Sequence, residues 1–423
     1  MTGLPRAYLV AHFGKSLMWH GGNVAFAFYL TEICRQSPTL MAWTLAFSSV
    51  INAVADGLIG AIRTRRTTEA ADATRQQLLG SIAAGSAFAA FCAAGIVPEP
   101  RRLAFALTTL FAFRIAYAFV DVPQNALLAH LPADTAQQER LVSARMMTGY
   151  AAQMSAAILL SSLILRRSAL DPVYFAVGGA MIGIMAIATA SVLSRSRNAA
   201  ADTHLAAARP IARNPPTSTF TRLLVASAAF AFVSTLVIRL QAYIAAYGDG
   251  PTNAGASPVV PSMVAFVPIA MALGGLIGQP LWAILCRRGG AAATLQVASV
   301  ALIGSALVFG ASAAWGGVLV PLSTGLFGVA LGGTSFALWT LLARSARDNP
   351  AARFGIFTCT SKLAHAASAL TLGAVLTGDN YRASFAGAAD LWSTSMIAAI
   401  AMGAALLVLI RAPLFWKSAF QNR

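Results

Sequence analysis

The feature that most constrains this chain is a window of about 20 apolar residues, recurring along its whole length, long enough to cross the hydrocarbon core of a bilayer as an α-helix. Of the 423 residues, 57% are hydrophobic and only 10% are charged. This composition is far more apolar than that of a soluble protein. The chain is therefore predicted to be an all-α integral membrane protein.

The apolar windows predict a specific helix order. Twelve transmembrane helices are predicted, at 8–33, 40–62, 78–97, 103–128, 143–164, 173–193, 220–247, 259–286, 291–311, 318–342, 356–377 and 390–410. The stretch 194–219 is polar, contains the Pro215-Pro216 pair and is predicted to be a cytoplasmic linker. We therefore expect two pseudo-symmetric six-helix halves, 1–193 and 220–423. A weak echo of this repeat is that basic residues follow both the second and the eighth helix.

The loop charges predict an orientation. If both termini are cytoplasmic, most of the 30 Lys and Arg residues fall on the cytoplasmic side, where such residues accumulate. We expect a multi-pass protein of a bacterial-type cytoplasmic (inner) membrane with both termini in the cytoplasm. The net charge of +16 is then explained by topology and by attraction to anionic lipid. The expected partners are the lipid bilayer and a small-molecule substrate, with no nucleic acid, and the expected state is a monomer.

Cofactor chemistry has no signature in the sequence. Cys34, Cys92, Cys286 and Cys359 stand singly in or beside apolar segments, without the spacing of a metal or redox site. No Gly-rich segment is followed by Lys and Ser or Thr at the spacing of an ATP-binding loop. We therefore expect no cofactor, no metal and no enzymatic activity.

Charged residues inside the predicted helices indicate what the protein does. They are the cations Lys15, Arg114, Arg145, Arg239 and Lys362 and the acids Asp56 and Asp121. A charge near the bilayer centre costs at least ~2.5 to 3.5 kcal/mol, so it is usually retained because it lines a polar path or binds something. The pattern is typical of a transporter.

Helical spacing places these charges on polar stripes. The stripes are His12, Lys15, Trp19 and Asn23 in the first helix, Asn52 and Asp56 in the second, Arg114, Tyr117, Asp121 and Asn125 in the fourth, and Thr358, Lys362 and His365 in the eleventh. In hydrocarbon such stripes must face protein partners or a wet cavity. Pairing both Asp residues still leaves three cations, so we expect an electropositive cavity that favours an anionic solute.

Two interpretations of the stripes stay open. The charged residues either line a solute path, or Asp56 and Asp121 pair with Lys15 and Lys362 to lock helices together. Packing is also the more common role of aromatic residues such as Trp19 and Tyr117 in a helix. For His20 and His365 we favour a packing hydrogen bond over a proton relay.

Several segments resemble the melibiose-permease-like glycoside-pentoside-hexuronide:cation symporters of the major facilitator superfamily. They are Phe13-Gly14-Lys15, Asn52 to Gly60, Tyr117 to Leu128, Glu139-Arg140-Leu141, Ser143 to Tyr150 and Ser361-Lys362-Leu363, which with their surroundings cover roughly half of the chain. The resemblance implies the major facilitator fold and alternating access. It also implies that Asp121 and Arg145 contact substrate, that Lys15 and Lys362 lie in or beside the polar core, and that Asp56 belongs to the cation site.

The chain departs from the family pattern at both sites. Ser16 stands where the family has an acidic residue, and Gln124-Asn125 stands where an aromatic residue commonly stacks on the sugar, so galactoside transport is not expected. The second helix has Asn52, Ala55 and Asp56 in place of two Asp residues and an Asn. Sodium needs several oxygen ligands, whereas a single buried carboxyl group can carry a proton. We therefore favour H⁺ over Na⁺ as the coupling ion.

The sequence thus predicts a secondary active transporter that moves a small polar organic solute, with an anionic solute favoured, by proton-coupled symport. The predicted substrate site consists of Lys15, Trp19, Tyr117, Asp121, Asn125, Arg145 and Lys362, and the predicted coupling site of Asp56, Asn52 and Asp121. The alternatives are efflux or transport of an amphipathic lipid, and a non-transporting membrane sensor or assembly factor on the same fold.

Overall fold

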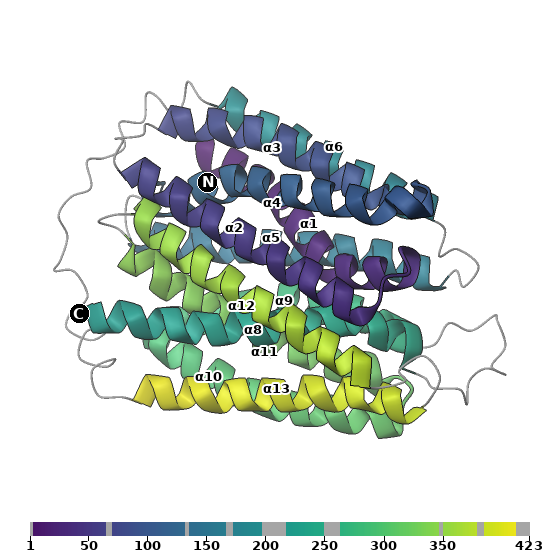
Figure 1. Ribbon diagram of the computed structural model, residues 1–423. Helices are drawn as coiled ribbons and strands as arrows, with labels where there is room; N and C mark the ends of the chain where they lie inside the picture. The colour runs from purple at the N-terminus through teal and green to yellow at the C-terminus, as the bar shows by residue number, and fades with distance from the viewer. Residues whose placement is uncertain are drawn as a thin grey trace.

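The computed structural model describes residues 3–64, 70–131, 135–165, 172–196, 217–248, 263–346, 350–378 and 385–411, and every regular element in these residues is helical. Long helices lie side by side along one common direction, with those of the first half (purple to blue) above those of the second half (teal to yellow) in Figure 1. The predicted all-α membrane fold is confirmed. Most of the predicted linker, 197–216, lies outside the described residues.

The helices begin and end within a few residues of most predicted bounds. The first half contains α1 (Leu4–Phe28), the π-turn η1 (Tyr29–Ile33), α2 (Pro38–Thr64), α3 (Ala70–Cys92), the 3-10 turn η2 (Ala94–Ile96), α4 (Glu99–His130), α5 (Thr135–Leu165) and α6 (Pro172–Arg195). The second half contains α8 (Thr217–Tyr247), the 3-10 turn η4 (Met263–Phe266), α9 (Val267–Ile277), α10 (Gln279–Trp315), α11 (Leu319–Ser345), α12 (Pro350–Gly378) and α13 (Phe385–Arg411). The largest differences are in α3 and α5, which each begin eight positions before the predicted residues 78 and 143.

Helix α10 contains the end of one transmembrane span and the whole of the next. Gly290 has a φ of +83°, in the left-handed region that only glycine adopts readily, and it breaks the helix there. The part before Gly290 continues α9 and completes the predicted eighth span. The part after it is the predicted ninth span, so the glycine supplies the turn between them.

The described helices are compatible with twelve spans. Eight stretches are long and apolar enough to cross a membrane, and one of these, Met263–Trp315, is the double span that Gly290 divides. Helices α1, α5 and α12 have similar lengths but contain the charged residues Lys15, Arg145 and Lys362. Large apolar side chains such as Phe47, Ile184 and Val408 are exposed on the outer surface, as expected of a surface that faces lipid.

The two halves repeat one packing scheme. In the first half α3 packs against α4 and α6, and α1 packs against α5 and α6. In the second half α10 packs against α11 and α13, and α8 packs against α12 and α13. Helices at equivalent places in the two halves therefore have equivalent neighbours, which is the parallel repeat of this class of transporter fold.

Two symmetry-equivalent helix pairs join the halves. Helix α2 packs along α12, and α5 packs against α9; Figure 1 shows α2 and α12 side by side at the centre of the bundle. Glycines allow the close approach, since a Cβ added at Gly373 would overlap Ala42 and one at Gly275 would overlap the ring of Tyr150. Close packing of α2 and α12 brings Asp56 to Lys362.

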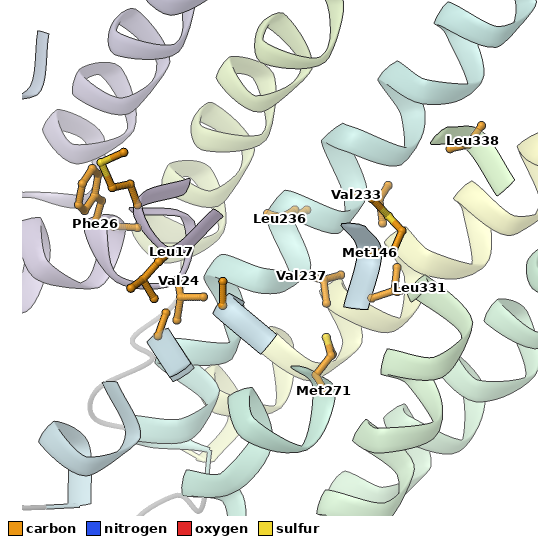
Figure 2. Close-up of a cluster of buried hydrophobic side chains, with 14 of the residues drawn as sticks. Leu17, Val24, Phe26, Met146, Val233, Leu236, Val237, Met271, Leu331 and Leu338 are labelled. Atoms are coloured by element: carbon orange, nitrogen blue, oxygen red, sulfur yellow. The ribbon is translucent and has the colours of Figure 1, made fainter. Parts of the chain in front are cut away.

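An apolar core fills the bundle beside these contacts. Figure 2 shows a cluster with members on five helices: Leu17, Val24 and Phe26 on α1, Met146 on α5, Val233, Leu236 and Val237 on α8, Met271 on α9, and Leu331 and Leu338 on α11. All of them are buried. Because the cluster draws on both halves, it fixes the apolar side of the cavity described next.

Candidate substrate and coupling site

A cavity of about 210 Å³ lies between the two halves. Helices α1, α4 and α5 form its first wall, and helices α8, α9, α11 and α12 form the second. All seven residues of the predicted substrate site line it: Lys15, Trp19, Tyr117, Asp121, Asn125, Arg145 and Lys362. The structure thus brings together residues that are far apart in the sequence, while their role in binding stays a prediction.

Asp121 is the centre of the polar wall. Its Oδ1 lies 2.6 Å from Nζ of Lys15, and its Oδ2 lies 3.1 Å from Nζ of Lys362. The side-chain amide of Asn125, one turn along α4, donates a hydrogen bond of 2.8 Å to Oδ1. One carboxylate therefore holds two ammonium groups from different halves.

Lys362 also binds the second carboxylate. Its Nζ lies 2.5 Å from Oδ2 of Asp56, whose side chain is fully buried and does not line the cavity. The ammonium group is thus shared between α2 and α4 of the first half, although it comes from α12 of the second. This arrangement contains the ion pairs of the packing interpretation and places one of them beside the cavity, so both interpretations of the stripes remain.

Arg145 extends the polar wall along α5. Its Nη2 donates a 2.8 Å hydrogen bond to Oδ1 of Asn125, which also accepts a 2.9 Å bond from Nζ of Lys15. The guanidinium lies over the ring of Trp339, 3.8 Å from its centroid, a cation–π contact between the halves. Trp339 was missed at the sequence level because no charged or polar pattern marks its helix.

Aromatic rings cover the other side of Lys362. The rings of Trp19 and Tyr117 stack with centroids 5.5 Å apart, and Nζ of Lys362 lies 5.6 Å and 5.5 Å from the respective centroids. The ring of His365 lies 5.1 Å from that of Trp19. Trp19 and Tyr117 therefore pack against each other and also line the cavity, so packing and substrate contact are compatible roles.

The predicted coupling residue Asn52 contacts the backbone of α4. Its Nδ2 donates to the backbone carbonyl of Arg114, and its side chain does not line the cavity. Asn52 and Asp56 lie on α2 as predicted, and their role in coupling stays a prediction. Gln124 is similarly engaged, since its Oε1 lies 3.2 Å from Nδ1 of His12.

The second wall of the cavity carries no charge apart from Lys362. It consists of the hydroxyl groups of Ser227, Ser234, Thr235, Ser335, Thr358 and Ser361 and the apolar side chains Phe230, Ala231, Ile238, Met271, Leu331, Leu338 and Phe357, with Gly328, Trp339 and His365. Sequence reasoning missed this wall because Ser and Thr are common in membrane helices. The steps of four, three and four from Ser227 through Ala231 and Ser234 to Ile238 are a signal that could have found its α8 face.

Hydrogen bonds between the halves flank the cavity at both ends of the bundle. At the end where α1 finishes, here called the distal end, the hydroxyls of Thr31 and Tyr243 lie 3.0 Å apart, and Tyr247 donates a 2.6 Å bond to Glu32. At the end where α1 begins, Gln138 of α5 donates a 3.0 Å bond to the carbonyl of Ala343 in α11. The cavity therefore lies between two ends of the bundle at which hydrogen bonds join the halves.

The His, Cys, Asp and Glu side chains of the described ranges do not cluster as metal ligands do. No group of three or more His, Cys, Asp or Glu side chains that could hold a metal ion occurs in these residues. The four cysteines are free thiols, and three of them are buried. The expectation that the protein uses no cofactor stays a prediction.

A two-fold repeat of six helices around a charged cavity is the architecture of membrane transporters of the major facilitator type. The family described as "MFS/sugar transport protein" matches residues 7–416, and the chain belongs to that family. The recognition of the superfamily from the sequence is thereby confirmed. No curated protein is similar enough in sequence to match.

Solved transporters have the same fold. A bacterial homologue of the iron transporter ferroportin, in an outward-facing state with soaked iron, is similar over 97% of this chain and 100% of that chain, with a TM-score of 0.68 and 14% identity. The E. coli xylose transporter XylE, partially occluded and inward open, gives a TM-score of 0.67 at 13% identity over 94% and 98%. The human organic anion transporter MFSD10 (TETRAN) gives 0.64 at 13% identity over 96% and 99%. At these identities the similarity establishes the fold alone.

Proposed function

We propose that this protein is a secondary active transporter that carries a small polar anionic organic solute by alternating access, coupled to protons as a symporter. The observation that carries the proposal is the composition of the cavity wall. Three cations, Lys15, Arg145 and Lys362, line it together with a single carboxylate, Asp121. Asp56 pairs with Lys362 from outside the wall, so one positive charge stays uncompensated, and an anionic group on the solute would offset it.

The polar wall suits a carboxylated sugar or a related hydroxy acid. Arg145 presents a guanidinium that can donate charge-assisted hydrogen bonds to a carboxylate. Its Nε and Nη1 are buried and have no hydrogen-bond partner within the described chain. Asp121 and Asn125 can bind hydroxyl groups, and Trp19 offers a ring face. Hexuronides combine these groups, and the glycoside-pentoside-hexuronide symporters, which this chain resembles, include carriers of that class.

Proton coupling is proposed from the two carboxylates that share Lys362. Protonation of Asp56 would free the ammonium group to bind Asp121 alone, and loss of that proton would draw it back. The cavity charge, and with it solute affinity, would thereby depend on proton occupancy. A sodium site is less well supported, because Oδ2 of Asp56 already contacts Lys362 and the amide of Asn52 binds the carbonyl of Arg114.

Alternating access is proposed for the two halves, which we assign to 1–193 and 220–423 with the linker 194–219 between them. We also propose a monomer in a bacterial-type inner membrane with both termini in the cytoplasm. In this orientation the distal end of the bundle faces outward, and the present structure has contacts between the halves at both ends.

A second candidate follows from the other wall of the cavity. Phe230, Ile238, Leu331 and Leu338 supply apolar surface on the second wall of the cavity. An anionic amphiphile could place its headgroup on the cations and its chain on this surface. Efflux or transport of an amphipathic lipid is therefore the alternative to transport of a small polar anion.

Ligand-induced stabilisation of the purified protein tests the substrate class. The matched pair is methyl glucuronide and methyl glucoside, which differ only in the carboxylate, with a lysophospholipid as the amphipathic probe. A ligand at about 100 times its Kd adds about 2.7 kcal/mol to a reversible folded state. We expect stabilisation by methyl glucuronide alone, reduced in Arg145→Gln. Stabilisation by the glucoside to the same extent would refute the anionic preference, and stabilisation by the lysophospholipid alone would favour the second candidate.

A further inference from the structure

Two of the five buried intramembrane cations take no part in the site around Asp121. Arg114 on α4 is 3% exposed and Arg239 on α8 is 2% exposed. Neither guanidinium has a carboxylate within ion-pair distance in the part of the chain that the structure describes. Both carboxylates of the bundle interior, Asp56 and Asp121, are already occupied by Lys15 and Lys362.

The contacts of the two arginines compensate their charge only in part. Arg114 lies among three rings, with its guanidinium 5.8, 6.0 and 5.5 Å from the centroids of Trp19, Phe26 and Phe113, and its buried Nε has no hydrogen-bond partner there. Arg239 donates a 3.2 Å hydrogen bond to the backbone carbonyl of His365. Ring faces and one carbonyl leave most of the guanidinium N–H groups available.

The two arginines contact Trp19 and His365 from different halves of the protein, Arg114 at the ring of Trp19 and Arg239 at the backbone of His365. Arg114 lies over Trp19, whose ring is 5.1 Å from that of His365, and Arg239 binds the backbone of His365. Trp19 and His365 line the main cavity, whereas the arginines do not. Arg114 precedes Asp121 by about two turns of α4. Arg114 and Arg239 therefore lie next to Trp19 and His365 but outside the cavity lining, on the distal side of the cavity.

Two like charges buried across an interface oppose its closure. Each loses its hydration, and the two repel each other. A small anion between them would offset both effects, since guanidinium groups bind carboxylate, phosphate or halide with charge-assisted hydrogen bonds. Because Arg114 and Arg239 belong to different halves, such an anion would also hold the halves together at the distal end.

We propose that Arg114 and Arg239 form a second anion site, separate from the cavity around Asp121 and specific for one small anionic group. The group is either a free inorganic anion or the carboxylate of a solute on its way past Trp19. The site does not depend on the proposed function, because it requires only the uncompensated charge of the arginines. Occupancy favours the closed distal end.

Thermal unfolding of the full-length protein in lipid nanodiscs tests this site. The protein is titrated separately with chloride, phosphate and methyl glucuronide. We expect at least one of them to stabilise the wild type saturably. Arg114→Gln and Arg239→Gln should each weaken that response about tenfold or more, the loss of one charge-assisted hydrogen-bonding partner. Arg101→Gln, an exposed charge on α4, should leave it unchanged.

Stability without anion provides the second readout. Removing one of two repelling buried charges should leave the Gln variants at least as stable as the wild type in anion-poor buffer. Response to chloride or phosphate identifies a free anion as the ligand, and response to methyl glucuronide alone identifies a solute carboxylate. An unresponsive wild type, or Gln variants that keep the wild-type response, would overturn the proposal. Solute binding in the main cavity is measured with Arg145→Gln, so the two proposals fail separately.

Discussion

The ammonium group of Lys362 contacts carboxylates from two helices, Asp56 on α2 and Asp121 on α4. The spacing of polar residues along each helix could not specify this shared contact. The sequence located Lys362, Asp56 and Asp121 in different helices and predicted polar contact among them. It could not choose partners, because a pairing depends on how closely α2 approaches α12. The close contact of Gly355 with Gly60 and Asp56 sets that distance, and a glycine in an apolar helix carries little signal of its partner.

The ion pair of Lys362 and Asp56 predicts a non-additive stability pattern. Lys362→Met should destabilise the protein by about 3 to 5 kcal/mol, because it leaves a buried carboxylate without its partner. The double variant Lys362→Met with Asp56→Asn should recover most of that loss, which thermal unfolding of the purified variants would measure. Additive losses would mean that the two residues do not depend on each other.

The same double variant separates the two interpretations of the stripes. If the pair only locks helices together, a stable double variant should still transport. If the pair couples protons to transport, the stable double variant should lose accumulation against a gradient. Flux assays on the double variant therefore decide between packing and coupling.

At the level of helices, small residues decide which spans meet. Helix order and most boundaries were predictable from apolar windows, because each span must satisfy the bilayer independently of its neighbours. Contacts between spans were not predictable from the sequence, since they depend on which helix faces pack against each other. The contact of Trp339 with Arg145 is one such unpredicted contact, and the hydroxyl-bearing face of α8 is another. Neither a tryptophan nor a serine is unusual in a membrane helix, so neither marked its position in the sequence.

The α2–α12 contact predicts opposite effects of one substitution at two glycines. Gly373→Ala should destabilise the protein by about 1 to 3 kcal/mol, because the added methyl overlaps Ala42 in a packed interface. Gly304→Ala on α10 meets open space and should instead stabilise its helix by about 0.5 to 1 kcal/mol. Thermal unfolding of the two purified variants measures both effects. Equal effects at the two glycines would show that α2 and α12 are not in close contact.

At the level of the whole molecule, hydrogen bonds join the halves at both ends of the bundle. The sequence predicted two halves and alternating access, but not the state in which the halves rest. Thr31, Glu32 and Tyr243 lie at the ends of otherwise apolar segments, and nothing in their spacing marks them as partners. The π-turn η1 places Thr31 and Glu32 against α8, and only the folded chain shows this.

A thiol cross-link across the distal end should trap one state. In a background without the four native cysteines, a short bifunctional methanethiosulfonate should join Thr31→Cys to Tyr243→Cys, because the tyrosine side chain holds the two Cβ atoms too far apart for a direct disulfide. The cross-link should stop transport, and its reduction should restore transport. Each single variant is the control for loss of the hydrogen bond. Full transport by the cross-linked protein would show that the distal ends of the halves need not separate.

Uptake of methyl glucuronide into proteoliposomes under an inward proton gradient tests the central claim, that an anionic solute is carried through the cavity around Asp121. We predict accumulation by the wild type, none of methyl glucoside, and loss of uptake in Asp121→Asn although the variant folds. Asp390→Asn, an exposed acid on α13, should retain full uptake. Undiminished uptake by Asp121→Asn, or equal uptake of the neutral glycoside, would contradict the claim.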